Sequence, residues 1–454
     1  DEEGIAINGT KKVVEYLKRK KEKINFCLVG EPTNPSRMGE MIKIGRRGSI
    51  TGYLSIFGKM GHVAYSHKAV NPSTCIVDIL KNLKQLRLDN GSKNFQPSNL
   101  EVTKININND ADNVIPKAAE ATIHGFRDEL IGMDADNIEH IWSYLWRYNS
   151  AFRGNSIGGA ISAIDMALWD IKGKRLKEPI WNLLGGKVRN KVRAIAQGIS
   201  GNSPDEFAKG AKKVLDEGFS ALKFTPMAKE WAQMNYTKMI GFAVESVRAV
   251  RETVGWEFDI GVEIHRNMQP HEAIAFCEEV APLRPYFIED PIVPDSVIAM
   301  GEVSKKMRLP LAVGERNMGI WEFREYAQIA KPAFFKPDIA VAGGITGVKK
   351  IATIAEAHHI KICPHNFQGP IATAACIALG ISSPSWDVQE SVQEDIPPRR
   401  DMTDEIIKLE NGWYTPSEKP GLGLNFNNDA PNKHPFDPAK VPPPIRDDGS
   451  VALQ

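Results

Sequence analysis

Residues 259–263 read DIGVE, residues 286–289 read YFIE and residues 311–315 read LAVGE, so three short apolar runs each end in a glutamate. The glutamates Glu263, Glu289 and Glu315 are separated by 26 residues and again by 26 residues. That distance accommodates one strand and one helix, and parallel strands joined by helices end at the same edge of a sheet. The runs therefore predict consecutive parallel strands whose terminal carboxylates converge at one mouth.

Further strand-like runs on both sides of these three extend the pattern to eight. Apolar residues at helical spacing fill the gaps, as in residues 236–253 and 346–357. Eight βα-type repeats over about 200 residues indicate an α/β protein with a closed (β/α)8 TIM-like barrel. An open doubly wound sheet is the alternative, but charged residues end too many of the strands for it. The expected strands are residues 192–199, 221–225, 259–265, 286–289, 311–315, 334–339, 361–365 and 386–390.

The three converging carboxylates are candidates for a metal site. A single glutamate at a strand end is usually a solvated rim residue. Three at equal spacing indicate a cation instead, because carboxylates that are brought together repel one another unless positive charge joins them. Ligands that are all oxygen select a hard ion such as Mg²⁺. We therefore expect Glu263, Glu289 and Glu315 to bind Mg²⁺.

Acid and base residues are expected at the same mouth. His265 follows Glu263 by two residues and so shares its strand face. His365 ends the seventh expected strand, and Asp338 ends the sixth, next to it. An aspartate beside a histidine fixes the ring tautomer and raises the basicity of the ring. Either histidine alone could be structural, but both at one mouth with the glutamates indicate catalysis. Glu390 ends the eighth strand and faces the same mouth.

Composition excludes several other classes of function. The chain has 454 residues, a formal net charge of +1 and 42% hydrophobic residues, which is ordinary for a globular protein of two or three domains. Near neutrality gives no electrostatic reason to expect binding to nucleic acid or to membranes. No apolar stretch approaches the ~18 residues of a membrane span, and no signal peptide is recognised. Five widely spaced cysteines without a CxxC pair favour a reducing cytoplasm.

Several stretches of the chain match those of a known family. They are residues 157–170 (IGGAISAIDMALWD), Glu263-Ile264-His265, Ile288-Glu289-Asp290-Pro291, Gly314-Glu315-Arg316, Pro337-Asp338 with Ala342-Gly343-Gly344, Pro364-His365-Asn366 and Val388-Gln389-Glu390. In these stretches, residues 128–454 resemble the mandelate racemase branch of the enolase superfamily. The resemblance is greatest to its galactonate dehydratase-type acid-sugar dehydratases.

The resemblance implies a cofactor and a role for each site residue. Mg²⁺ is held by the three glutamates, and one departure is Glu263, where many relatives carry Asp. The other implied roles are His365, backed by Asp338, as the base, His265 as the acid, Glu390 as the residue that stabilises the enolate oxygen, and Arg316 and Lys223 as substrate-binding residues. The implied reaction is dehydration of an aldonic acid through an enediolate to a 2-keto-3-deoxy acid, as in galactonate or gluconate dehydratases.

A second departure from the family pattern bears on the reaction. Relatives that racemise or cycloisomerise often carry Lys-x-Lys at the end of the second strand, whereas this chain reads Lys223-Phe224-Thr225. The missing lysine argues against racemase chemistry. Mannonate dehydratases are the nearest alternative, because the chain resembles them at residues 343–347 and 419–423. We rank them second, since they lack an Asp–His pair such as Asp338 and His365.

Residues 1–126 form a separate small α+β pattern. Helices are expected over residues 9–20 and 75–86, and strands over residues 24–29, 49–57 and 100–107. The stretches Asp1-Glu2-Glu3-Gly4, VGEPT at 29–33, GRRG at 45–48, GHVAY at 61–65 and NVIP at 113–116 resemble succinyl-diaminopimelate desuccinylase of the M20 metallopeptidase family. The resemblance implies Glu2 as base, Glu3 and Glu31 as metal ligands, and His62 as a helper across a dimer. Two ligands cannot hold a dizinc pair, and the sequence begins at Asp1 within a motif. We therefore expect an inactive fragment, mainly a dimerisation domain.

These patterns predict four parts and one main function. The parts are residues 1–126 as the desuccinylase-like fragment, 127–186 as a truncated enolase-type cap, 187–410 as the catalytic barrel, and 411–454 as a tail returning over barrel and cap. The enolase match begins near Arg127, after the strand-rich stretch that supplies substrate loops, so the sequence does not identify the aldonate. We expect a cytoplasmic homo-oligomer acting on a small sugar acid. The alternative is an inactive chimera with a dimerisation module.

Overall fold

The computed structural model describes residues 10–23, 37, 79–83, 85, 88–93, 97–98, 100, 118–148, 154–435 and 444–452. The chain divides into two compact units, one of residues 1–55 with 79–103 and the other of residues 56–78 with 104–454. Among the described helices, none is long and apolar enough to cross a membrane.

In the first unit the structure describes mainly helix α1 (Thr10–Lys20), which confirms the first expected helix. Residues 79–83 and 85 are helical, within the span of the second. The strands expected over residues 24–29, 49–57 and 100–107 lie outside the described residues, apart from Leu100. The residues that resemble the M20 site also lie outside them; they are Glu2, Glu3, Glu31 and His62.

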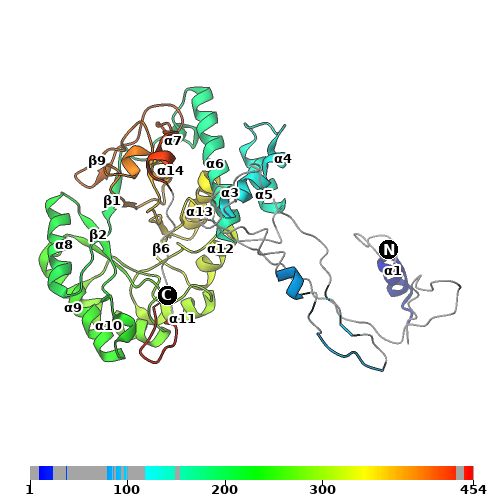
Figure 1. Cartoon of the computed structure of the whole chain (residues 1–454), viewed down its shortest axis with the longest axis horizontal. Coiled ribbons are helices and arrows are strands. Elements are labelled where there is room, and N and C mark those ends of the chain that lie inside the picture. The colour runs from blue at the N-terminus through cyan, green and yellow to red at the C-terminus, as the bar shows by residue number, and fades with distance from the viewer. Residues whose placement is uncertain are drawn as a thin grey trace. The chain divides into compact units, whose positions relative to one another are not determined.

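The second unit contains the expected (β/α)8 barrel (Figure 1). Its strands pair in parallel and in chain order from β1 to β7. The sheet closes because β8 pairs with β1, and a parallel bridge joins Ile362 to Trp386 just before β8. The strands are β1 (Val192–Ala196), β2 (Ala221–Phe224), β3 (Asp259–Glu263), β4 (Phe287–Glu289), β5 (Leu311–Val313), β6 (Phe334–Phe335), β7 (Lys361–Ile362) and β8 (Val388–Ser391).

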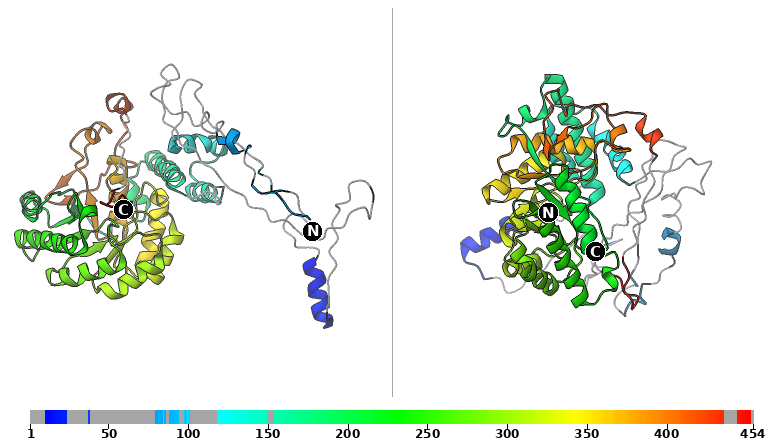
Figure 2. Two further views of the ribbon diagram at one scale, coloured as in Figure 1. Left: turned by 60° about the horizontal axis from the view of Figure 1, so that its bottom comes forward. Right: turned by 90° about the vertical axis from the view of Figure 1, so that its left-hand side faces the viewer.

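Helices follow the strands in turn and surround the sheet, as the views in Figure 2 also show. Their apolar faces pack against the outer side of the strands to form the main core. Polar side chains fix several helix starts, where Ser203, Asn235 and Ser296 accept backbone N–H groups. The helices are α8 (Pro204–Asp216), α9 (Tyr236–Val254), α10 (Pro270–Val280), α11 (Val297–Met307), α12 (Ile320–Ile329), α13 (Gly344–Ala357) and α14 (Pro370–Ser382), with 3-10 turns η2 (Trp231–Gln233), η3 (Ala281–Leu283) and η4 (Arg399–Asp401).

Several strands end earlier than the sequence predicts. The runs expected over residues 311–315, 334–339 and 361–365 contain strands of 3, 2 and 2 residues. The backbone leaves the pleated conformation just beyond the strands, as at Gly314 with φ +137° and His265 with φ +56°. Glu263 is the last residue of β3, and Asp338 and His365 are joined by a single parallel bridge beyond β6 and β7. The candidate site residues of these strands therefore lie at the strand ends or just beyond them.

The barrel interior has an apolar layer with a charged layer above it. Gly261 on β3 admits the ring of Phe287, because a Cβ at this position would lie 2.6 Å from a ring carbon. The strands then carry buried charged groups toward their carboxyl ends, including Lys223, Glu289 and Glu390. The apolar layer consists of Ile195, Ala221, Phe287, Ala312, Phe334, Cys363 and Val388.

Helices precede the barrel in the second unit: α3 (Ala118–Gly125), α4 (Arg127–Leu130), α5 (Ile138–Tyr148), α6 (Asn155–Leu176) and the short α7 (Ile180–Leu183). Helices α5 and α6 share a small apolar core that includes Trp142 and Ile161. The buried Ser162 of α6 connects these helices to the barrel. Its Oγ accepts the N–H groups of Gly343 (2.9 Å) and Gly344 (3.0 Å) at the start of α13. Helix α6 thereby fixes the segment that follows β6.

The tail after β8 contacts both the barrel and α6. Strands β9 (Leu409–Glu410) and β10 (Trp413–Tyr414) form a hairpin, and β10 pairs antiparallel with β1. Further along, the carbonyl of Gly421 accepts the N–H of Ile180 at 3.0 Å. Gly421 also lies against Gly173 of α6, where a Cβ would come within 2.7 Å of it. Helix α15 (Ala430–Lys433) follows.

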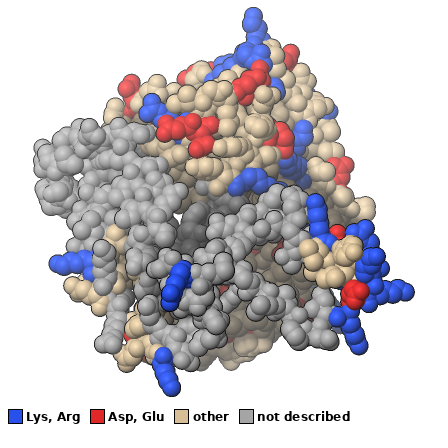
Figure 3. Space-filling model, turned by 90° about the vertical axis from the view of Figure 1, so that its right-hand side faces the viewer, with Lys and Arg blue, Asp and Glu red and all other residues tan. Residues whose placement is uncertain are grey.

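The described surface carries charges of both signs. Over the upper part of the face drawn in Figure 3, Lys and Arg side chains alternate with Asp and Glu. The whole chain has 57 basic and 56 acidic residues. Charges mixed in this way screen one another, so this part of the face exerts little long-range attraction on a charged partner.

Ser162→Ala tests the connection between α6 and the barrel. The substitution leaves two buried N–H groups without an acceptor, so we expect the free energy of unfolding to fall by about 2–3 kcal/mol. The matched control is Ser246→Ala, because Ser246 is equally buried but only donates to the carbonyl of Phe242 in its own helix. Urea titration measures both variants, and equal losses would show that Ser162 has no special role at this junction.

Candidate active site

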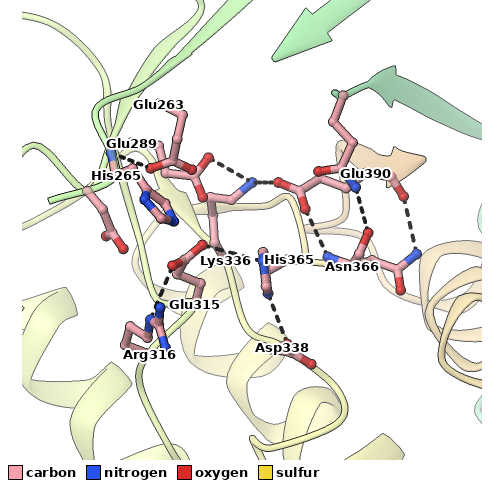
Figure 4. Close-up of polar contacts among 12 residues, drawn as sticks. Glu263, His265, Glu289, Glu315, Arg316, Lys336, Asp338, His365, Asn366 and Glu390 are labelled. Atoms are coloured by element: carbon pink, nitrogen blue, oxygen red, sulfur yellow. Dashed lines mark hydrogen bonds and ion pairs between the residues drawn. The ribbon is translucent and has the colours of Figure 1, made fainter. Parts of the chain in front are cut away.

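Three buried glutamates meet at the carboxyl ends of neighbouring strands (Figure 4). Glu263 and Glu289 lie opposite each other in the β3–β4 register, and Glu315 follows β5. One carboxylate oxygen from each lies within 4.8 Å of the others. Gly314, just before Glu315, has φ +137° and leaves room for Phe323 and for the start of the next segment, because a Cβ there would lie 2.7 Å from a ring carbon of Phe323 and 3.0 Å from the backbone nitrogen of Lys336. The convergence predicted from the equal spacing is therefore present in the structure.

Lys223 of β2 lies among these carboxylates. Its Nζ is 3.1 Å from Glu263 Oε2, 3.0 Å from Glu289 Oε2 and 2.6 Å from Glu390 Oε1. Burial acts to lower the pKa of Lys223, but the three carboxylates outweigh it and raise the pKa well above its usual value. Lys223 lines the cavity at the barrel mouth, and its ammonium group is already shared by three acidic side chains.

Lys336 is a second buried cation, and sequence reasoning did not single it out. It follows β6, and its Nζ lies 3.2 Å from Glu289 Oε2 and 2.5 Å from Glu390 Oε1. The sequence does place Lys336 two residues before Asp338, and alternate residues on a strand share a face. This spacing could have indicated that Lys336 points toward the same site. Lys336 therefore connects Glu289, one of the candidate metal ligands, to Glu390 of the eighth strand.

Arg266 is the third buried cation of the cluster, and like Lys336 it was not predicted from the sequence. Its Nη1 forms an ion pair with Glu315 and lies 3.6 Å from Asp290 Oδ2, and its Nη2 is 2.8 Å from His265 Nε2. The whole residue is buried. Arg266 and His265 both have positive φ, at +68° and +56°, a backbone conformation that costs energy in non-glycine residues. Periodicity could not reveal this pair, because it depends on that turn.

His265 lies beside the carboxylates as predicted. Its backbone N–H donates to Glu263 Oε1 at 2.9 Å. Burial and, after it, the charge of Arg266 lower the pKa of its ring to about 4. The residue therefore contacts a candidate metal ligand through its backbone and a cationic side chain through its ring.

His365 and Asp338 form the predicted pair. His365 Nδ1 lies 2.9 Å from Asp338 Oδ2, and its Nε2 lies 3.4 Å from Glu315 Oε2. Because a carboxylate only accepts, Nδ1 donates its proton to Asp338, whereas Nε2 faces Glu315 and the cavity. Burial acts to lower the pKa of His365, but the hydrogen bond to Asp338 and the charges of Glu390 and Glu315 raise it.

Glu390 is buried within β8, on the same layer as the two lysines. Its Oε2 accepts the backbone N–H of Asn366, the residue after His365, at 2.9 Å. Burial acts to raise the pKa of Glu390, but Lys223 and Lys336 outweigh it and hold the pKa below its usual value. The side chain is thus a fixed negative charge next to the candidate base.

A cavity of about 710 Å³ opens above this cluster. Its lining brings together seven of the nine predicted site residues: Lys223, Glu263, His265, Glu315, Arg316, Asp338 and His365. Arg316 is half exposed there, with its Nε 3.4 Å from Glu315 Oε1. Glu289 and Glu390 are fully buried below the cavity floor. Helix α6 contributes Asn155 to the rim.

The donor set of the cluster fits a divalent cation. If all are ionised, five carboxylates and three cationic side chains leave two negative charges in excess. Within the described residues, Glu289 Oε1 accepts no hydrogen bond and joins no ion pair. Burial and then carboxylate repulsion raise the pKa of Glu289 to about 8. The charged groups are Glu263, Glu289, Asp290, Glu315 and Glu390 with Lys223, Arg266 and Lys336.

Comparisons with known families match both parts of the chain. The model of the enolase C-terminal domain-like family matches residues 206–430, and that of the mandelate racemase / muconate lactonizing enzyme N-terminal domain matches residues 111–185. The peptidase dimerisation domain matches residues 44–139. The last two matches overlap over residues 111–139, which is where the two patterns of the sequence meet.

Individual relatives agree with the family models. D-galactonate dehydratase of Klebsiella pneumoniae (strain 342) is 33% identical over 319 residues, which cover 69% of this chain and 83% of that protein. An enolase-superfamily member from Salmonella Typhimurium has a TM-score of 0.67 at 29% identity, covering 70% of this chain and 87% of that one. An enolase from Agrobacterium radiobacter with bound Na and L-malate has a TM-score of 0.71 at 25% identity, covering 74% and 89%.

The first part of the chain has a different relative. Succinyl-diaminopimelate desuccinylase of Pelagibacter ubique (strain HTCC1062) is 69% identical over 124 residues, which make up 27% of this chain and 32% of that protein. The chain thus spans about a third of the length of this relative. The larger match, to the dehydratase, covers most of its relative, and the enolase C-terminal domain-like model spans the nine predicted site residues, from Lys223 to Glu390. The chain therefore belongs to the mandelate racemase branch of the enolase superfamily, as a carbon–oxygen lyase of the dehydratase type.

Proposed function

We propose that this protein dehydrates an aldonic acid to a 2-keto-3-deoxy acid in a Mg²⁺-dependent reaction of the galactonate or gluconate dehydratase kind. The observation that carries the proposal is the presence, around one cavity, of the three-glutamate cluster and the hydrogen-bonded pair of Asp338 and His365. The similarity to D-galactonate dehydratase supports the same substrate class. Enolase-superfamily sites combine a His or Lys base with Mg²⁺ in this manner.

Glu263, Glu289 and Glu315 would hold the ion. Their three ligand oxygens already lie within 4.8 Å of one another, and a donor set made only of carboxylate oxygens suits Mg²⁺. When bound, Mg²⁺ would supply positive charge to the carboxylate of the substrate and so acidify its C2 proton. Lys223 and Arg266 hold oxygens of the same glutamates and limit their movement.

His365 would remove the C2 proton through its Nε2. Asp338 holds Nδ1–H and stabilises the positive charge that the ring gains. His265 would protonate the departing 3-hydroxyl from its neutral ring through Nδ1–H, since Arg266 only donates and contacts Nε2. The C3–O bond then breaks, water leaves, and the enol that forms tautomerises to the 2-keto acid. Arg316 reaches the cavity as an exposed cation and would bind the substrate there. Contact between Lys223 and the substrate remains a prediction.

Two observations favour an acid-sugar dehydratase over its alternatives. Thr225, at the cavity, occupies the place of the second lysine that racemases carry, and we propose His365 and His265 as the proton-transfer groups. The stretches that resemble mannonate dehydratases have packing roles instead: Gly343 and Gly344 contact Ser162 of α6, and Gly421 contacts Gly173. The Asp338–His365 pair then separates this chain from the mannonate group.

We further propose that residues 1–126 act as an inactive dimerisation module, with 127–186 as the cap, 187–410 as the barrel and 411–454 as the tail. The match of residues 44–139 to a peptidase dimerisation domain supports this, and implies a homo-oligomer. The cysteines at 277, 363 and 376 are free and buried, which suits a reducing cytoplasm. An inactive chimera is the outcome if no sugar acid is turned over.

The experiment that tests the proposed function is a screen of aldonic and aldaric acids with Mg²⁺, in which a 2-keto-3-deoxy product is detected. We expect turnover of at least one six-carbon aldonate. Turnover of none of the acids, by protein that is folded and loaded with Mg²⁺, would contradict the proposal.

Activity should require a divalent cation that binds oxygen ligands. EDTA should abolish turnover and Mg²⁺ should restore it. Glu289→Gln removes a fully buried carboxylate from the proposed ligands. Loss of a residue that only contacts a metal ligand typically lowers metal affinity roughly 10–100-fold. Loss of Glu289, as a ligand itself, should lower it by more. Glu302→Gln is the control, since Glu302 is an exposed glutamate on α11. Full turnover in metal-free buffer would refute the metal assignment.

Substitution of His365 and of His265 should have different effects on the exchange of the substrate's C2 proton with solvent. His365→Asn should lose dehydration and also the exchange of the C2 proton with D2O, by about 10²–10⁴-fold each. His265→Asn should lose dehydration but retain C2 exchange, because the base remains. The control is His358→Asn at the exposed end of α13. NMR of a turned-over sugar acid measures the exchange, and the reverse pattern would mean that the two roles are interchanged.

A further inference from the structure

The segment after His365, residues 366–369, is tied to its surroundings at several points. The carbonyl of Asn366 accepts Gln197 Nε2 at 2.8 Å, and its N–H donates to Glu390. The carbonyl of Phe367 accepts Arg399 Nη2 from the tail at 2.8 Å. The partners lie just after β1, in β8 and in η4, so the segment has a fixed path along the cavity wall.

Gln368 is the member of this segment that reaches back to the candidate base. Its Nε2 donates to Asp338 Oδ2 at 2.9 Å, which is the same oxygen that accepts His365 Nδ1–H, also at 2.9 Å. The other oxygen, Oδ1, accepts the N–H of Ala340 at 2.8 Å. Asp338 is therefore held by three donors, and Gln368 is the one of them that lies on an exposed residue of the cavity wall.

From this geometry we infer that Gln368 is a positioning residue for the base. The inference rests on the proposed role of His365 and Asp338. A carboxylate with one backbone donor and one histidine can still rotate, and the amide of Gln368 fixes its plane by engaging Oδ2 from a second direction. The amide also takes a share of the negative charge on that oxygen, so it sets how strongly Asp338 polarises the ring of His365.

A merely structural role for Gln368 fits the contacts less well. Its side chain packs in no apolar cluster of the described structure, and its backbone neighbours are held independently by Gln197 and Arg399. Removing the side chain should therefore leave the segment in place. What changes is the carboxylate of Asp338, and through it the orientation of His365.

The first test compares Gln368→Ala with wild type. We expect kcat and the rate of C2 exchange to fall about tenfold, as for the loss of one hydrogen bond to a charged group, with KM within twofold of wild type. Gln368→Glu has the same shape but cannot donate when ionised, so it should be at least as slow. Gln393→Ala, at an exposed glutamine beyond β8, is the control and should be unchanged. Wild-type rates in Gln368→Ala would overturn the inference.

A double-mutant cycle tests the route through Asp338. If Gln368 acts by orienting this carboxylate, Gln368→Ala should slow C2 exchange less than twofold in an Asp338→Asn background, against about tenfold in wild type. An equal loss in both backgrounds would show that Gln368 acts elsewhere, and would overturn the inference.

A third measurement does not depend on any activity. In full-length protein labelled with ¹⁵N-histidine, the Nδ1–H signal of His365 is the one that disappears in His365→Asn. This signal should shift and exchange faster with water in Gln368→Ala, but not in Gln393→Ala. An unchanged signal would overturn the inference. A changed signal in protein that turns over no sugar acid would support the role of Gln368 while contradicting the proposed function.

Discussion

The structure of the site depends on one electrostatic constraint, the mutual repulsion of buried carboxylates at neighbouring strand ends. Glu263, Glu289 and Glu315 lie within 4.8 Å of one another through one oxygen each. Burial makes this repulsion strong, because the interior screens charge far less than water does. Lys223, Lys336 and Arg266 offset most of it, and each is itself buried because it is bound to these acids. A divalent cation would balance the remainder.

The scaffold positions these groups from three parts of the chain. The barrel brings the strand ends together, helix α6 fixes the segment after β6 through Ser162, and η4 of the tail holds the segment after β7 through Arg399. The candidate acid–base pair joins these two segments, since Asp338 follows β6 and His365 directly precedes residues 366–369. Residues on these short segments are thereby held by hydrogen bonds from other parts of the chain.

The sequence predicted the eight strands and the converging glutamates, because equal spacing of strand ends follows directly from βα repeats. It did not reveal the contribution of Arg266, which depends on two residues with positive φ, or of Gln368, which depends on a hydrogen bond between segments 30 residues apart. Lys336 was visible as the residue two before Asp338, but only the closed barrel shows that it reaches Glu390. Several strands were predicted too long, because the pattern of apolar residues does not show where the backbone leaves the extended conformation.

We propose that Glu263, Glu289 and Glu315 together hold a divalent cation, and the rest of the proposed function depends on this ion. The most direct measurement is an anomalous difference map from crystals of the protein grown with Mn²⁺, which replaces Mg²⁺ and scatters anomalously. The account predicts one strong peak at the barrel mouth, bonded to a carboxylate oxygen of each glutamate, and no such peak in crystals of Glu289→Gln. A wild-type map without a peak at this cluster, or with the ion bound by other residues, would contradict it.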